Sequence, residues 1–203
     1  MPWYLDKFSE AGRKYGAATA LWDQSDYISA HMPPALRNGV CQSLVAMWMA
    51  SRANWSVFTN VVKSPGGKAH VRGFMNLQHE GIRIQSINGR QGVTNYFQFQ
   101  ADIFGIGFTG QEWKDRPVDA YDICTAVKSA PGYYYLNFYS HTGGHSVGFV
   151  YRADTEMTFF DPNCGTATFA GGIGLTRFLD AVLRTIYSSF NEEWYVHRYN
   201  PKR

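Results

Sequence analysis

A chain of 203 residues with 45% hydrophobic residues is long enough to bury a core without disulfides or metal ions. A net charge of +3 without a dense Lys or Arg run argues against nucleic acid or an anionic membrane as the partner. The cysteines Cys41, Cys124 and Cys164 are odd in number and widely spaced, which excludes a disulfide framework and suits a reducing compartment. We expect no metal and no cofactor, and a single domain over 1–203 in which 1–30 form a helical extension.

The first predicted elements are helices. The pattern is weakly helical up to Tyr27, and a loop over 32–39 follows, framed by two prolines and a glycine. From Cys41 to about Ala53, apolar side chains recur at helical spacing, which predicts a buried helix.

The middle of the chain is less distinct. Turns are expected over 64–68 and 87–92, because both stretches contain paired or closely spaced glycines. The segments 72–85 and 93–105 fit either helix or strand. The glycine-rich stretch 107–113 lacks the Lys-Ser/Thr pair of a phosphate-binding loop.

The last third alternates clearly between element types. A helix over 118–130 ends at a Pro-Gly pair, and an amphipathic helix over 174–190 carries Tyr187 on its core side. Strands are expected over 132–140, 145–152, 157–163, 166–170 and 193–200. This order predicts an α+β fold in which a helical N-terminal part packs on a C-terminal antiparallel β-sheet.

Cys41 is the first of three residues with possible catalytic chemistry. The string Gly39-Val40-Cys41 places a thiol at the start of the predicted helix. Unsatisfied backbone N–H groups and the positive end of the helix dipole favour an anion there, and a thiolate is the reactive form of cysteine. A lone cysteine at this position is more often a packing residue, because free cysteines are usually buried.

His145 and Asp161 are the other two. His145 follows two glycines in "GGHSVGF" at the start of a strand, and Asp161 ends a strand in "FFDPNCG". Taken alone, each reads as a turn residue. Taken together, they lie sixteen positions apart, which is the length of a β-hairpin, so Asp161 returns to the end of the sheet that carries His145. A carboxylate there would fix the tautomer of the imidazole.

The order Cys, His, Asp and the strings around it resemble the papain-like cysteine proteases of bacterial effectors, the YopT/AvrPphB type. "NGVCQSLVAMW", "GGHSVGF" and "FFDPNCG" are similar to that family's three blocks, and the resemblance extends over about 35–200. It implies a papain-like fold and hydrolysis of peptide bonds by a triad of Cys41, His145 and Asp161. Between 55 and 118 the sequence shows no motif of the family.

The second donor of the oxyanion hole departs from the family pattern. Papain-like enzymes usually place Gln or Asn five or six residues before the cysteine, and here those positions hold Leu36 and Ala35. The backbone N–H of Cys41 is one expected donor. For the other we expect Asn38, with Gln24 as the more distant candidate.

The resemblance also implies a setting. A secreted bacterial toxin or effector would act on a protein substrate in the cytoplasm of a host or competitor cell, and an immunity or inhibitor protein would be a possible partner. The stretch MPWYLDKFSE does not read as a signal peptide, so we expect export by a specialised secretion system, and no apolar run is long enough for a membrane span.

Two other functions stay open. Transglutaminases, glutamine deamidases and bacteriocin-processing peptidases use Cys, His and Asp in this order and share the acyl-enzyme step. A non-enzymatic binding module on an inactivated protease scaffold is the third interpretation.

Overall fold

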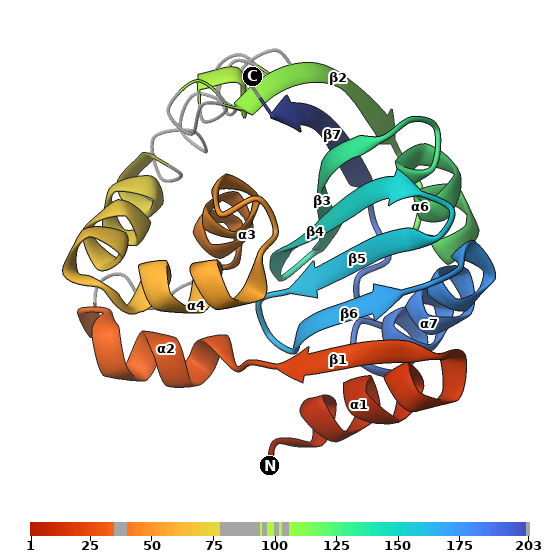
Figure 1. Ribbon diagram of the computed structural model, residues 1–203, viewed down its shortest axis with the longest axis horizontal. Coiled ribbons are helices and arrows are strands. Elements are labelled where there is room, and N and C mark those ends of the chain that lie inside the picture. Colours follow the sequence, from red (N-terminus) through yellow and green to blue (C-terminus); the bar gives the residue numbers. More distant parts are fainter. Residues whose placement is uncertain (35–39, 78–93, 95–96, 100–101, 103–105, 202–203) are drawn as a thin grey trace.

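The computed structural model describes residues 1–34, 40–77, 94, 97–99, 102 and 106–201. Their centre is a seven-stranded sheet of order β1-β6-β5-β4-β3-β7-β2, in which every neighbouring pair is antiparallel (Figure 1). The strands are β1 (Ala17–Leu21), β2 (Ile106–Lys114), β3 (Gly132–Ser140), β4 (Gly143–Ala153), β5 (Glu156–Asp161), β6 (Gly165–Phe169) and β7 (Trp194–Pro201).

Helices cover both faces of this sheet. The labelled helices are α1 (Trp3–Tyr15), α2 (Gln24–His31), α3 (Cys41–Ala50), α4 (Trp55–Lys63), α6 (Ala120–Val127) and α7 (Gly172–Thr185), and residues 65–77 are helical as well. One apolar cluster joins α1, α6 and α7 to one face, and a second joins α2, α3 and α4 to the other. Figure 1 shows α3 and α4 on the opposite side of the sheet from α6 and α7.

Helix α3 is the element that carries Cys41, and nine of its ten residues are buried. A helix that is apolar on all sides belongs in a core, and α3 lies between α4 and the sheet. The predicted helix extended to Ala53, whereas α3 ends at Ala50. It ends there because Arg52 and Ala53 adopt a left-handed backbone with φ of 55°.

The predicted α+β fold is confirmed, and so are most elements of the last third of the chain. Strand β3 has the predicted bounds, and β4, β5, β6 and β7 lie within a few residues of theirs. Helix α6 also agrees with its prediction. The turn over 87–92 and the loop residues 35–39 lie outside the described residues, as does most of 93–105.

Three sequence predictions are wrong. The helical pattern up to Tyr27 is interrupted by strand β1, because Gly16 takes a left-handed conformation with φ of 76° and ends α1. The turn over 64–68 is instead a helix start, since the Ser64 hydroxyl accepts a hydrogen bond from the Gly67 N–H at 3.0 Å. The helix over 174–190 ends earlier, at Thr185.

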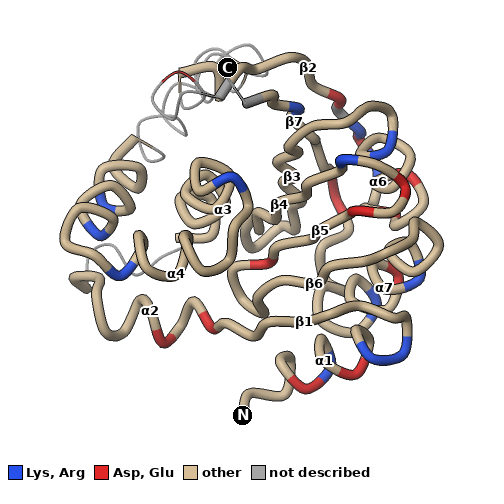
Figure 2. Tube along the Cα trace, viewed as in Figure 1, with Lys and Arg blue, Asp and Glu red and all other residues tan. Residues whose placement is uncertain are grey.

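Charged residues of both signs are intermingled along α1 and α7 (Figure 2). This mixture agrees with the small net charge of the sequence. Within the described part of the chain, no helix is both long and apolar enough to cross a bilayer.

Candidate active site

Cys41 is the first residue of α3, directly after the N-cap residue Val40, whose side chain makes no capping hydrogen bond. The residue is 5% exposed, so its thiol lies inside the protein beside the end of the sheet. The first N–H groups of a helix have no partner within the helix, and they create a positive potential at this thiol. The local sequence therefore places the sulfur where a negative charge is stabilised.

The thiol of Cys41 contacts two consecutive residues of β4. It hydrogen-bonds to the His145 side chain and to the backbone N–H of Ser146, and the Ser146 hydroxyl lies beside it. Burial by itself would raise the pKa of Cys41, but the hydrogen bond and charge of His145, followed by the bonds from Ser146, lower it overall. Sequence reasoning missed Ser146, and the one signal that could have found it was its place next to His145.

His145 and Asp161 meet at the same end of the β4–β5 hairpin. Their strands pair with Gly148 opposite Phe160, and Nε2 of His145 lies 3.0 Å from Oδ1 of Asp161. Both side chains are buried. Burial would lower the pKa of His145, yet the neighbouring Asp161 carboxylate and its hydrogen bond raise it well above its usual value.

The contact with Asp161 assigns the two imidazole nitrogens. An ionised carboxylate can only accept, so Nε2 of His145 carries the proton in this pair. Nδ1 is then the nitrogen left to exchange a proton with the sulfur of Cys41. The three residues therefore form a continuous line of contacts from thiol to imidazole to carboxylate.

Tyr187 is a further member of this cluster that the sequence placed only in the core. Its hydroxyl donates to Oδ2 of Asp161 at 2.6 Å and lies 3.1 Å from Nε2 of His145. Its ring stacks on the imidazole of His145, with centroids 4.9 Å apart and 19° between the planes. The one signal in the sequence is chemical, because a buried phenol needs a hydrogen-bond partner.

Of the two side chains expected to donate to the oxyanion, Asn38 and Gln24, the structure describes only Gln24. Asn38 lies outside the described residues. Gln24, the first residue of α2, donates a hydrogen bond from Nε2 to Oδ1 of Asn163, two residues beyond Asp161. Asn163 in turn donates from Nδ2 to the Tyr187 hydroxyl at 3.0 Å, so Gln24 joins the same cluster.

The remaining cysteines have the opposite electrostatic character to Cys41. Cys124 lies on α6 and Cys164 follows β5, and burial raises the pKa of both thiols. Nearby carboxylates raise the pKa of Cys164 further. Among the residues that the structure describes, no group of three or more His, Cys, Asp and Glu side chains is arranged to hold a metal ion.

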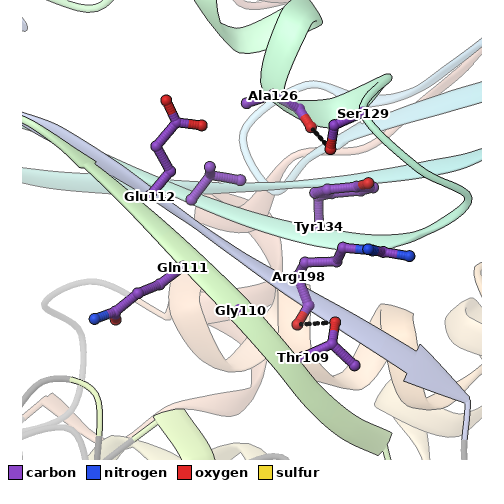
Figure 3. A pocket seen from close by; sticks show the side chains of 9 residues that line it. Thr109, Gly110, Gln111, Glu112, Ala126, Ser129, Tyr134 and Arg198 are labelled. Carbon is purple, nitrogen blue, oxygen red and sulfur yellow. Dashed lines mark hydrogen bonds between the residues drawn. The ribbon is translucent and has the colours of Figure 1, made fainter.

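A surface pocket of about 180 Å³ lies toward the other end of β3 and β7 from His145 (Figure 3). Its lining residues are Thr109, Gly110, Gln111, Glu112, Ala126, Ser129, Tyr134, Val196 and Arg198. Several of its polar groups are already engaged within the protein: Thr109 donates to the Arg198 carbonyl, and Ser129 donates to that of Ala126. None of the lining residues belongs to the Cys41 cluster, so the pocket is separate from it.

Comparisons with known proteins show the family and the fold of the chain. The family Peptidase_C58, described as Yersinia/Haemophilus virulence surface antigen, matches residues 9–193. The solved structure of the Pseudomonas avirulence protein AvrPphB superposes with a TM-score of 0.66 at 11% identity, covering 80% of this chain and 92% of that one. PatoxP, a cysteine protease-like domain of the Photorhabdus asymbiotica toxin PaTox, gives a TM-score of 0.53 at 13% identity, covering 97% of this chain and 57% of that chain. No curated protein sequence matches significantly. At these identities the two structures share the fold, and the expected papain-like fold is confirmed.

Proposed function

Since the chain belongs to the Peptidase_C58 family of Yersinia/Haemophilus virulence surface antigens, we propose that it is a cysteine peptidase with the triad Cys41, His145 and Asp161. The observation that carries this proposal is the contact of the Cys41 thiol with an imidazole whose other nitrogen is held by a buried carboxylate. A thiol at a helix start and a carboxylate-bound imidazole are the two parts that nucleophilic acyl transfer requires.

In the first half of the reaction, the proton of the Cys41 thiol moves to Nδ1 of His145. The thiolate attacks the carbonyl carbon of a peptide bond, which forms a C–S bond and places a negative charge on the carbonyl oxygen. When the C–N bond breaks, Nδ1 gives its proton to the leaving amine. Asp161 keeps the imidazole turned toward the sulfur throughout.

In the second half, a water molecule loses a proton to Nδ1 of His145 and attacks the thioester carbon. The C–S bond then breaks, the acid product leaves, and the sulfur of Cys41 recovers its proton. The backbone N–H of Cys41 at the helix start is one proposed donor to the oxyanion. Gln24 is the other described candidate, because only one of its two Nε2 protons is used by Asn163.

The proposed setting follows from the family rather than from the site. We place the enzyme among secreted bacterial toxins or effectors that leave the cell through a specialised secretion system and cut a protein in the cytoplasm of a host or competitor cell. A free thiol that must stay reduced suits that compartment. An immunity or inhibitor protein covering Cys41 is a proposed partner of the producing cell.

The experiment that tests this function compares new protein N-termini in cells that express the wild type or Cys41→Ala. The proposal expects discrete new N-termini that depend on Cys41. A mass increase of about one dalton on glutamine residues, or cross-linked species, would instead assign the same acyl-enzyme step to a deamidase or transglutaminase. Identical profiles for the two proteins, together with an unreactive Cys41, would favour a binding module.

A further inference from the structure

Tyr187 lies just beyond the C-terminal end of α7, where the helix gives way to a turn. Helix α7 ends at Thr185, and the backbone N–H of Tyr187 donates to the Leu183 carbonyl at 3.2 Å. The side chain is 5% exposed, and the rings of Phe138 and Phe190 pack edge-on against it at 5.2 and 5.6 Å. This apolar enclosure fixes the phenol ring in place beside the imidazole of His145.

The hydrogen bonds around Tyr187 have a single consistent direction. Its hydroxyl has one proton, and the ionised carboxylate of Asp161 can only accept, so that proton goes to Oδ2 at 2.6 Å. The same oxygen accepts a hydrogen bond from Nδ2 of Asn163 at 3.0 Å. Burial, followed by the charge of Asp161, raises the pKa of Tyr187 well above its usual value, so the phenol keeps its proton.

Both oxygens of the Asp161 carboxylate are thereby held. Oδ1 faces Nε2 of His145 and also accepts the backbone N–H of Asn163 at 2.8 Å. Oδ2 is held by Tyr187, and the Cys164 thiol adds a contact to the same carboxylate. A carboxylate anchored at both oxygens cannot rotate, so Oδ1 stays on the imidazole.

The direction of these hydrogen bonds also determines the orientation of the Gln24 side-chain amide. Because Nδ2 of Asn163 donates to Tyr187, Oδ1 of Asn163 must be the atom that faces α2, where it accepts from Nε2 of Gln24. The second proton on Nε2 of Gln24 is donated to no other residue that the structure describes. The hydrogen bonds thus run in one direction from Gln24 through Asn163 and Tyr187 to Asp161.

We infer that Tyr187 and Asn163 are positioning residues, which lock the Asp161 carboxylate onto His145 and couple the Gln24 amide to that carboxylate. This inference deepens the proposed function and rests on it for its catalytic meaning. In this assignment the Tyr187 hydroxyl acts through the Asp161 carboxylate to which it donates. Asn163 connects the orientation of the carboxylate with that of the amide, two groups that come from opposite ends of the chain.

Tyr187→Phe tests the first part, because it keeps the stacked ring and removes only the hydroxyl. The probe is iodoacetamide, and mass spectrometry follows alkylation of Cys41 across pH. If Asp161 turns away, the imidazolium of His145 loses support, so alkylation begins about one pH unit higher than in the wild type. Where a cleaved peptide is known, kcat should fall about 10- to 100-fold with KM little changed, and the alkaline limb of its pH profile should move down.

A matched control is Tyr134→Phe on strand β3, which removes a part-buried hydroxyl bonded to the Ala130 carbonyl. It should lose stability without moving the alkylation profile of Cys41. In an Asp161→Asn background, Tyr187→Phe should cause no further shift, because its effect passes through Asp161. An unchanged or acid-shifted profile for Tyr187→Phe, or an additive shift in the double variant, would overturn the inference.

Asn163→Ala is the second variant, and it keeps the backbone N–H that bonds Asp161 while removing the amide that links Tyr187 with Gln24. We expect it to slow kcat, and we expect Gln24→Ala to add little to it. If the losses in kcat from Asn163→Ala and Gln24→Ala were fully additive, the two residues would not act through one chain of hydrogen bonds. Alkylation of Cys41 needs no substrate, so the positioning role of Tyr187 is decided even if no peptide bond is found to be cleaved.

Discussion

His145 and Asp161 lie sixteen residues apart in the chain, yet Nε2 of one is 3.0 Å from Oδ1 of the other. The antiparallel pairing of β4 with β5 brings them together, because the hairpin leaves and returns at the same end of the sheet. The β4–β5 hairpin alone therefore explains this contact, and no element distant in the sequence is needed for it. Cys41 arrives separately, on the helix that packs against β4.

Loss of the thiol or the imidazole should abolish the proposed reaction. We expect Cys41→Ala and His145→Ala to lower cleavage by at least about a thousandfold, because nucleophile and base act as one unit. Asp161→Ala should cost less, since the stacked Tyr187 ring still restrains the imidazole. The measurement is cleavage of a target found by N-terminal profiling, with circular dichroism to verify folding. Cys124→Ala is the control, and equal losses in it and in Cys41→Ala would contradict the assignment.

Ser146 should help to hold the thiolate of Cys41. Its hydroxyl has one proton, which in the structure is donated to Oδ1 of Asn137 at 2.6 Å, and a thiolate would compete for it. We expect Ser146→Ala to raise the pKa of Cys41 and slow its alkylation near neutral pH. Ser43→Ala is the matched control, because the Ser43 hydroxyl is buried without a hydrogen bond to any described residue. Equal alkylation rates for the two variants would count against this role.

Gly148 determines how closely α3 approaches the sheet. A Cβ at this position would lie 2.9 Å from Cζ3 of Trp48 and 3.1 Å from Cγ1 of Val45, both on α3. We expect Gly148→Ala to lower the free energy of unfolding by ~1–3 kcal/mol, measured by urea denaturation, and to displace the helix that carries Cys41. Gly73→Ala should have the opposite sign, stabilising by ~0.5–1 kcal/mol, because that helical glycine faces open space. A neutral Gly148→Ala would show that α3 does not pack as described.

His197 should make the protein sensitive to acid. It is fully buried among aromatic rings, stacked on Phe97 at 4.1 Å, with no hydrogen bond from either ring nitrogen to a described residue. Burial lowers its pKa to about 3, whereas an unfolded histidine titrates near 6.5. Between these values the unfolded chain binds the extra proton, so stability should fall as pH drops below about 6.5, by up to ~1.4 kcal/mol per pH unit.

The variant His197→Phe isolates this contribution. It keeps an aromatic ring in the cluster and removes the titrating group, so its free energy of unfolding should depend less steeply on pH between about 6 and 4. Urea denaturation at several pH values measures the slope. Parallel slopes for wild type and variant would mean that His197 does not remain neutral in the folded state.

The sequence predicted those parts of the fold whose signal is local. The alternation of apolar and polar residues in 145–152 and 157–163 predicted the hairpin. The apolar stretch after Cys41 predicted α3. Both predictions were possible because the spacing of apolar side chains indicates which of them are buried. Strand β1 was missed because Ala17–Leu21 carries little apolar alternation, and only pairing with β6 far along the chain makes it a strand.

The site was predictable to the same extent. Cys41, His145 and Asp161 stand in recognisable strings, and the structure brings their side chains together. Tyr187 could not be placed, because helical periodicity puts it on the core side without showing that the helix stops at Thr185 and turns the phenol toward Asp161. Gln24 reaches the cluster only through Asn163, a contact across most of the chain that no local pattern encodes.

The proposed mechanism depends on a proton that the thiol of Cys41 and the imidazole of His145 share. The most direct test measures the rate of Cys41 alkylation by iodoacetamide from pH 4 to 10 in the wild type and in His145→Ala. We expect Cys41 in the wild type to react at a lower pH than Cys124, and His145→Ala to move the Cys41 profile toward that of an ordinary thiol. Superimposable profiles for the two proteins would contradict it.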